Sequence, residues 1–297
     1  MSKKRSCIIT MVQDENVFLP IWLKYYSKCF SREDIYIINH NSRDENMRIC
    51  SSYQGVNIIR AHHDSFDDIW KICMVKEQQT KLLQCYEYVL YTDADEIIIP
   101  NPGKYKDLKE YVSRFDKRSV CCTGYELIHL REEEPRIDLK ASILEQRKYW
   151  FLNALYNKPL LSNIPMDWTP GFHSANNRCL VDADLWLLHL HKFDFDLCWQ
   201  KHKKIAAAKH NPLCIKKGYA YQYQISTLEE FTKLFHTRCF DHVKLERSRW
   251  RRFMSYLRIF ATAKIFKHQP IQSYHEYAAN HPLIARIPKI LRGTKII

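Results

Sequence analysis

Short apolar runs alternate with longer amphipathic runs over the first third of this chain, and that alternation limits the folds open to it. The short runs have the length of strands, and the runs between them space their apolar side chains as helices do. Strands and helices in this order form a largely parallel sheet with right-handed crossovers. The expected strands are 7–12, 35–38, 56–59 and 88–92, and the expected helices are 17–29 and 67–84.

Beyond Pro100 the spacing of the runs becomes irregular. No Gly-x-Gly-x-x-Gly follows the first expected strand, which excludes a dinucleotide-binding Rossmann site of the usual kind. A capping box at Ser226-Thr227-Leu228-Glu229 predicts the start of a late helix. The other expected elements are helices at 104–115 and 194–209, strands at 120–130 and 185–191, and basic, aromatic-bearing helices from 247 onward.

Composition excludes several classes of protein. The 297 residues contain no apolar run long enough to span a bilayer, and the short run after the basic N-terminus is too brief for a signal peptide core. The eleven cysteines are odd in number and show no Cys-x-x-Cys spacing. We therefore expect reduced, mostly buried thiols, no zinc site and a cytoplasmic protein.

The formal net charge is +13, and basic residues concentrate late in the chain. Such a balance favours an anionic partner, which means a nucleotide, a nucleic acid or a membrane surface. A solvated basic face is the competing interpretation for any one cluster. Residues 247–267 place aromatic and aliphatic side chains on one helical face between arginines, which predicts either peripheral membrane contact or packing on the rest of the protein.

The most informative stretch is 88–99, where an apolar run ends in three carboxylates. In an extended chain Asp93 and Asp95 point the same way, and Glu96 is expected to support the local backbone. Carboxylates at the carboxyl end of a buried strand lie where open α/β sheets bind ligands, and a metal ion or cationic partner is expected there. Turn or capping carboxylates are the alternative. Two more Asp-x-Asp triplets do not close such a strand: Asp182/Asp184 and Asp194/Asp196.

With these motifs in order, the chain resembles the family 2-like nucleotide-sugar glycosyltransferases, which have the GT-A fold. The similarity extends from about residue 5 to residue 205, and the C-terminal third matches no family that we can name. Four places carry the resemblance: Met11–Glu15 with Leu19–Tyr26, Ile37–Asp44, Tyr91–Glu96, and Pro170–His173 with Leu188–Asp194.

The resemblance implies an α/β fold with a GT-A-like mixed sheet flanked by helices and a basic helical C-terminal extension. It implies a catalytic domain over 1–210, followed by a helical, basic region over 211–297 that packs on it or contacts a membrane or partner. The implied activity is metal-dependent transfer of a hexosyl or deoxyhexosyl unit from a nucleotide-sugar donor to a hydroxyl acceptor, with inversion. The acceptor would be a glycan, a lipid-linked carrier or another hydroxyl compound.

The resemblance also implies roles for individual residues. Asp95 is the expected ligand of Mn²⁺ or Mg²⁺, since hard cations prefer oxygen. His189 and His191 lie at period 2 on one side of a strand, with Leu190 opposite, and are expected to complete the metal site; buried core histidines are the alternative. The expected donor-binding residues are Thr10, Gln13, Glu15, Asn39, Asn41 and Asp93.

Inverting transfer requires a carboxylate that deprotonates the acceptor hydroxyl. Asp167 and Asp194 are the two candidates, and the sequence does not choose between them. Trp168 and Phe172 are expected to line the pocket as a sugar-stacking platform, with aromatic packing as the alternative, and His173 is expected beside them.

Two other classes of function remain open at this stage. The first is a nucleic-acid or membrane-surface binding module, which the net charge favours; the sequence contains no recognised nucleic-acid motif, so a nucleic-acid partner is disfavoured. The second is a metal-dependent phosphohydrolase built on a similar sheet.

Overall fold

A computed structural model describes residues 3–42, 44–177, 179–217, 224–237, 250, 284–294 and 296. The basic segment 247–267 lies outside the described residues, apart from Trp250. None of the helices in the described ranges is long and apolar enough to cross a bilayer. The ten cysteines of the described ranges are free thiols, and most of them are buried, as expected.

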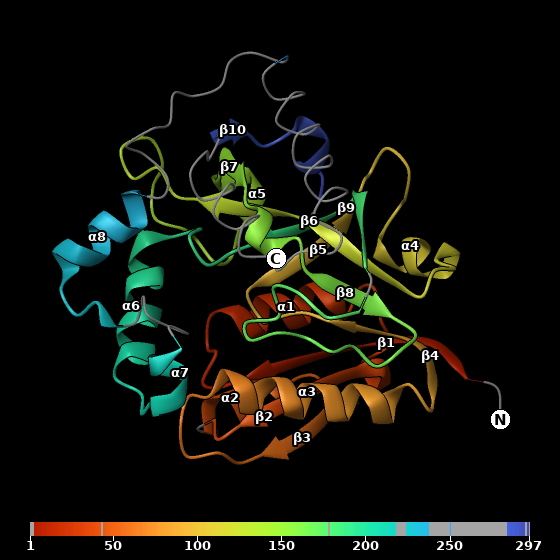
Figure 1. The fold of residues 1–297 in the computed structure, drawn as a ribbon. Coiled ribbons are helices and arrows are strands. Elements are labelled where there is room, and N and C mark those ends of the chain that lie inside the picture. Colours follow the sequence, from red (N-terminus) through yellow and green to blue (C-terminus); the bar gives the residue numbers. More distant parts are fainter. Residues whose placement is uncertain are drawn as a thin grey trace.

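Four parallel strands form one half of the sheet, in the order β3-β2-β1-β4 (Figure 1). They correspond to the four strands predicted from the sequence, and the helices between them are also confirmed. The bounds of the strands are β1 Lys4–Val12, β2 Ile35–His40, β3 Asn57–Ala61 and β4 Tyr86–Tyr91. The bounds of the helices are α1 Phe18–Tyr26, α2 Asp44–Ser51 and α3 Asp68–Leu82.

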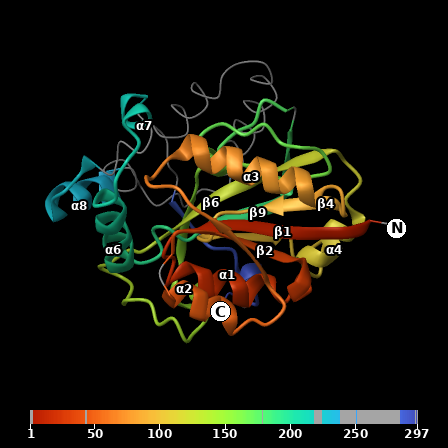
Figure 2. The same cartoon turned by 90° about the horizontal axis from the view of Figure 1, so that it is seen from below.

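Helices cover both faces of this parallel half. Figure 2 shows α3 on one face and α1 with α2 on the other. Adjacent residues of β1 point to opposite faces, so Ile8 packs in the hydrophobic cluster that contains Trp22 of α1, whereas Ile9 packs with Val75 of α3. The prediction of an α/β sheet flanked by helices is therefore confirmed.

The other half of the sheet is mostly antiparallel. β8 pairs with β4, β6 pairs with β8 and β7, and β9 runs parallel to β6 and antiparallel to β5. The sheet is therefore mixed, as expected for a GT-A-like architecture. The bounds are β5 Glu96–Pro100, β6 Ser119–Ile128, β7 Tyr149–Leu152, β8 Pro159–Ser162 and β9 Leu180–His189, with short helices α4 Leu108–Arg114 and α5 Ile143–Gln146.

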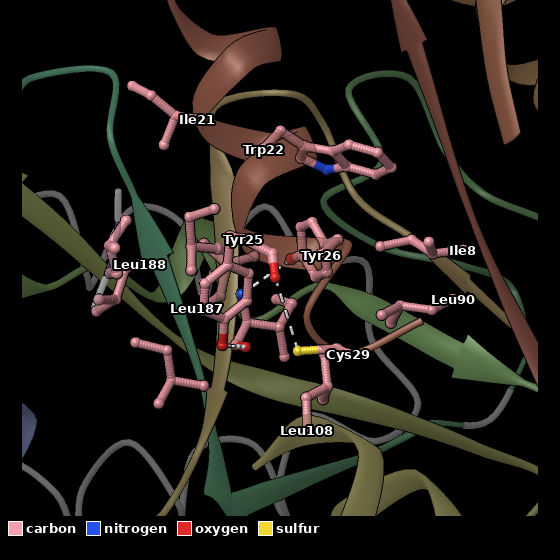
Figure 3. Packing of buried hydrophobic residues seen from close by; sticks show 14 of the residues in the cluster. Ile8, Ile21, Trp22, Tyr25, Tyr26, Cys29, Leu90, Leu108, Leu187 and Leu188 are labelled. Atoms are coloured by element: carbon pink, nitrogen blue, oxygen red, sulfur yellow. Dashed lines mark hydrogen bonds between the residues drawn. The ribbon is translucent and has the colours of Figure 1, made fainter. Parts of the chain in front are cut away.

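Helix α1 packs between the two halves. Figure 3 shows its aromatic side chains between Ile8 and Leu90 of the parallel half and Leu187 and Leu188 of β9. The Trp22 indole donates to Thr92 Oγ1 at 2.8 Å, directly before the carboxylates that follow β4. The position of those carboxylates is thereby tied to the core.

Three helices follow β9 and lie together at one end of the molecule, far from the N-terminus (Figure 1). They are α6 Phe195–Ala206, α7 Pro212–Lys216 and α8 Leu228–Thr237. The predicted capping box is one residue out of register, because Thr227 is the cap and pairs with Glu230 at 2.8 Å.

Within 211–297, α7 and α8 are helices as expected, but the described end of the chain departs from the expected helical structure. Ile284–Arg286 forms a strand, β10, that pairs antiparallel with β7 at the edge of the sheet. Ile284 is buried in a small cluster with Tyr149 and Phe151 of β7. Pro282 and Pro288 flank this short run and disfavour a helix, and the free edge of β7 supplies the hydrogen-bonding partners.

Gly124 lies where β6 passes close to the turn Ala154–Tyr156. A Cβ atom at this position would be 2.4 Å from Tyr156 Cβ and 2.5 Å from its carbonyl carbon. Gly124→Ala should therefore lower the free energy of unfolding by about 1–3 kcal/mol, because backbone must move to make room. Urea denaturation measures the change. Gly293→Ala is the matched control, since nothing lies within 4 Å of its added Cβ, and equal midpoints for the two variants would contradict the prediction.

Candidate active site

The candidate site is the turn between β4 and β5, at the carboxyl ends of the parallel strands. Asp93 and Asp95 lie in this turn, and Glu96 begins β5. The Leu190 amide donates to the Asp95 carbonyl at 2.8 Å, so the end of β9 is fastened to the turn. Glu96 accepts from the Asp93 amide at 2.9 Å and so supports the local backbone. The three carboxylates lie where α/β sheets bind ligands.

Asp93 is held by two lysines. Its oxygens lie 2.8 Å from the Lys71 ammonium and 2.7 Å from that of Lys158, and the Tyr91 hydroxyl donates to it at 2.8 Å. Burial alone would raise the pKa of Asp93, but Lys158 and Lys71 lower it below its usual value. Lys158 is itself buried and also pairs with Glu96 at 2.6 Å. Asp93 is therefore a partly buried anion, with its side chain 21% exposed, and it is fixed from two sides.

Asp95 is paired with a third lysine, which comes from α6. The Lys201 ammonium lies 2.9 Å from Asp95 Oδ2 and 2.9 Å from Glu15 Oε1. Asp95 is 8% exposed, and although burial opposes its charge, Lys201 and His189 hold its pKa well below the usual value. The Asp95 and Glu15 carboxylates therefore form a binding site for a positive charge, and the Lys201 ammonium occupies it.

Two histidines approach the same carboxylate oxygen. His189 Nε2 lies 3.7 Å and His191 Nδ1 3.8 Å from Asp95 Oδ2. Their rings are stacked with centroids 5.6 Å apart, and Leu190 is buried in the core, so the predicted alternation is confirmed. His189 also contacts Glu126 Oε1 through Nδ1 at 2.7 Å.

The two imidazoles differ in charge. Burial opposes protonation of His189, but Glu126 and Asp95 raise its pKa to about 10, so it is an imidazolium at neutral pH. Burial lowers the pKa of His191, and Lys201 and His189 lower it further. His191 is therefore neutral, with the lone pair that a metal ligand needs.

The residues around Asp95 allow a direct test of the expected cation. Across the described ranges, no three His, Cys, Asp or Glu side chains are grouped so as to hold an ion alone. Asp95 and His191 offer one carboxylate and one neutral imidazole, and the Lys201 ammonium already stands in for a cation there. Mg²⁺ in particular is held by one or two carboxylates together with substrate phosphates. This donor set fits a cation that binds together with a diphosphate.

The expected donor-binding residues of β1 and β2 lie near the carboxyl ends of these strands, and the two asparagines among them are engaged in the fold. Thr10 is fully buried, and its hydroxyl has no partner among the described residues. Asn39 accepts from the Ser42 amide at 3.2 Å, and Asn41 donates to the His63 carbonyl at 2.7 Å. Gln13 is half-buried just after β1. The two asparagines shape the turn after β2.

Neither predicted catalytic base is in contact with the Asp95 cluster. Asp194 is the N-cap of α6, accepting from the Asp196 and Leu197 amides, and it pairs with Arg147 at 3.3 Å. It is 2% exposed and its contacts belong to the fold, and its role as a base stays a prediction. Asp167 is half-exposed and pairs with Lys76 at 2.8 Å, which lowers its pKa and makes it a weaker base.

The predicted pocket aromatics belong to the core. Trp168 is 4% and Phe172 1% exposed, and both pack against Tyr91. The packing alternative therefore holds, and no sugar-stacking platform is formed by these two rings. Phe172 lies beneath the Lys71 ammonium, 5.3 Å from the ring centroid, so it contacts the cluster from inside. His173 Nδ1 donates to the Leu155 carbonyl at 2.8 Å.

Five residues that the sequence did not single out as site residues complete the cluster, and they are Lys71, Glu126, Tyr156, Lys158 and Lys201. Glu126 is a buried carboxylate in the middle of an apolar strand, and such a residue requires a partner, which is a signal that the sequence contains. Tyr156 stacks on His189 with centroids 3.9 Å apart. Lys158 and Lys201 are ordinary lysines in the sequence, and only the fold brings them to the carboxylates.

Comparison with known proteins gives likeness of fold alone. No family model and no curated protein matches the chain. The solved structure of S. aureus TarS 1–349 covers 93% of this chain and 88% of its own, at 13% identity and a TM-score of 0.36. The structure of an active-site mutant of LgtC covers 52% of this chain and 56% of its own, at 17% identity and a TM-score of 0.27. The structure of a cytidylyltransferase from Leptospira borgpetersenii covers 45% of this chain and 57% of its own, at 10% identity and a TM-score of 0.28. Likeness of this size carries no inference about activity.

The charge of His189 gives the stability a measurable pH dependence. Because the pKa is about 10 in the folded chain and 6.5 ordinarily, the stabilisation is complete below pH 6.5 and is lost as the pH rises toward 10. The difference in unfolding free energy between the wild type and His189→Gln should therefore shrink over that interval. Urea denaturation in the presence of a chelator measures it. The exposed His62→Gln should follow the wild type, and a difference for His189→Gln that is constant with pH would contradict the assignment.

Proposed function

We propose that the chain is a glycosyltransferase that moves a hexosyl or deoxyhexosyl unit from a nucleotide sugar to a hydroxyl acceptor, with inversion. The observation that carries the proposal is the Lys201 ammonium between Asp95 and Glu15, each 2.9 Å away. This position lies at the carboxyl ends of β1 and β4, where a diphosphate and its counter-cation bind in sheets of this kind.

Lysines of the cluster suit a donor with a charged diphosphate. The side chains of Lys71 and Lys201 are 27% and 16% exposed, so both ammonium groups border the surface of the cluster. Lys158 is 1% exposed and stays with Asp93 and Glu96. We infer that Lys71 and Lys201 orient the donor phosphates and offset the negative charge that grows on the leaving group.

Asp95 and His191 are the residues that would hold Mn²⁺ or Mg²⁺. When bound, the cation supplies Lewis-acid stabilisation of the departing diphosphate. His189 is a poorer ligand because it is protonated between Glu126 and Asp95. Its imidazolium instead lies between the Asp95 and Glu126 carboxylates and offsets their mutual repulsion. It also adds positive charge beside the leaving group.

Glu126 is our candidate for the base that inversion requires because it lies in the cluster beside His189; His189 lowers its pKa as Lys76 lowers that of Asp167, so position and not basicity favours Glu126. Asp93, Asp95, Glu96 and Glu15 each pair with a lysine, whereas Glu126 contacts His189 at 2.7 Å and Asn153 at 3.4 Å and pairs with no lysine among the described residues. We infer that Glu126 accepts the proton of the acceptor hydroxyl, with His189 fixing the orientation of the carboxylate.

The first test of the activity is Asp95→Asn. With a nucleotide sugar, Mn²⁺ and a hydroxyl acceptor, transfer should fall by about two to four orders of magnitude, because the amide neither holds a cation nor offsets Lys201. Turnover assays across nucleotide sugars, with and without acceptor, measure it. Asp184→Asn is the matched control, since Asp184 pairs with Lys104 at the far end of the β5–β9 ladder and should leave transfer unchanged.

If the Asp95→Asn variant transferred the sugar at the wild-type rate, the active site would not lie in this turn. A wild-type protein that binds no nucleotide sugar, or that hydrolyses donor equally with and without acceptor, would contradict the proposed transfer reaction.

The second test separates the two candidate bases. Glu126→Gln keeps the size of the side chain and should lower kcat about 10²–10⁴-fold with little change in the KM for the donor. Asp167→Asn, at the carboxylate paired with Lys76, should retain kcat. Steady-state kinetics of both variants at saturating donor measures the effect. If Asp167→Asn loses activity and Glu126→Gln does not, the base is Asp167.

A further inference from the structure

Helices α6 and α7 carry an unbroken run of positive charge. Residues 197–217 contain six lysines and neither Asp nor Glu. Lys203 and Lys204 of α6 are exposed, and so are Lys209, Lys216 and Lys217 around α7. Figure 1 shows both helices at one end of the molecule, on the side away from the N-terminus. Lys204 pairs with Asp14 at 3.9 Å, and the other exposed lysines of this surface are suited to an anionic partner.

The same surface exposes aliphatic side chains. Leu213 is 47% and Ile215 45% exposed, on either side of Cys214, which is buried. Two large aliphatic side chains in the middle of a lysine-rich surface are a poor fit to solvent alone. Lysines can contact nucleic-acid phosphates, but single-stranded bases stack on aromatic rings and not on aliphatic side chains such as these.

Helix α7 is rigidly attached, so these side chains are held outward. Asn211 caps α7 by accepting from the Leu213 amide at 2.9 Å, and its side chain donates to Asp67, the cap of α3, at 2.5 Å. The chain on either side of His210 exchanges two backbone hydrogen bonds with Phe66, at 2.6 and 3.0 Å. These hydrogen bonds therefore hold α7 in an orientation in which Leu213 and Ile215 are exposed.

We propose that the surface formed by Leu213, Ile215, Lys209, Lys216 and Lys217 docks on an anionic lipid bilayer. The aliphatic side chains enter the headgroup region and the lysines face the acidic headgroups. This inference is independent of the proposed activity. Docking would nevertheless affect the proposed activity, because α6 also carries Lys201 of the donor site. A bilayer bound at this surface would lie beside that site, which favours a lipid-borne hydroxyl acceptor.

The test is sedimentation of the full chain with phosphatidylcholine vesicles, with and without phosphatidylglycerol. The wild type should sediment only with the anionic vesicles. The pair Leu213→Ser and Ile215→Ser, and separately the pair Lys216→Glu and Lys217→Glu, should each weaken binding roughly ten-fold or more. The controls are Leu139→Ser, which changes another exposed leucine, and the pair Lys106→Glu and Lys109→Glu near α4, and both should bind as the wild type does.

Three outcomes overturn the proposal. In the first, the wild type does not sediment with anionic vesicles. In the second, neither the double serine variant nor the double glutamate variant of α7 binds the vesicles more weakly than the wild type. In the third, the double serine variant binds as the wild type does and duplex DNA competes with the vesicles. Transfer to a soluble acceptor, measured on the same variants, should be unchanged, so that failure of docking is distinguished from failure of the proposed activity. Thermal unfolding of each variant verifies that it is folded.

Discussion

The buried ammonium of Lys158 is the interaction on which the candidate site depends. It lies within 2.7 Å of Asp93 and 2.6 Å of Glu96 and precedes β8, so it joins the antiparallel half of the sheet to the turn after β4. Asp93 and Glu96 would repel each other without it, and because Lys158 and Glu96 are each 1% exposed, removing either would leave a buried charge unpaired, which typically costs about 3–5 kcal/mol. Lys158 pairs with Asp93, so of the two aspartates in the turn only Asp95 contacts Lys201 and the two histidines.

The parallel half of the fold was predictable, since each strand and helix there obeys its own local pattern. The runs at 7–12 and 88–92 are apolar and bounded by polar turns, and the helix at 67–84 has an aspartate cap at Asp67. Beyond residue 100, β8 was missed because it is only four residues long and begins with proline. β10 was missed because its pairing with β7 joins segments more than a hundred residues apart, which no local pattern reports.

The candidate site was predictable only in part. Asp95 and the two histidines stand out because strand alternation places them on one side, and the structure brings them within 4 Å. Asp194 caps α6, and the sequence did not reveal this because a helix cap and a catalytic carboxylate have the same appearance in a sequence. The lysines that neutralise the cluster come from three distant segments, and a lysine with no local pattern around it cannot be told from a surface residue until the fold is known.

The cap of α6 has a consequence for the site at some distance. Asp194 fixes the first turn of the helix, and buried Arg147 fixes Asp194. Lys201 is seven residues farther on, about two turns and on the same side of the helix axis. The reach of its ammonium to Asp95 is thus set by a cap that touches no substrate. Loss of that cap would be measured as weaker affinity for the donor as well as a lower melting temperature.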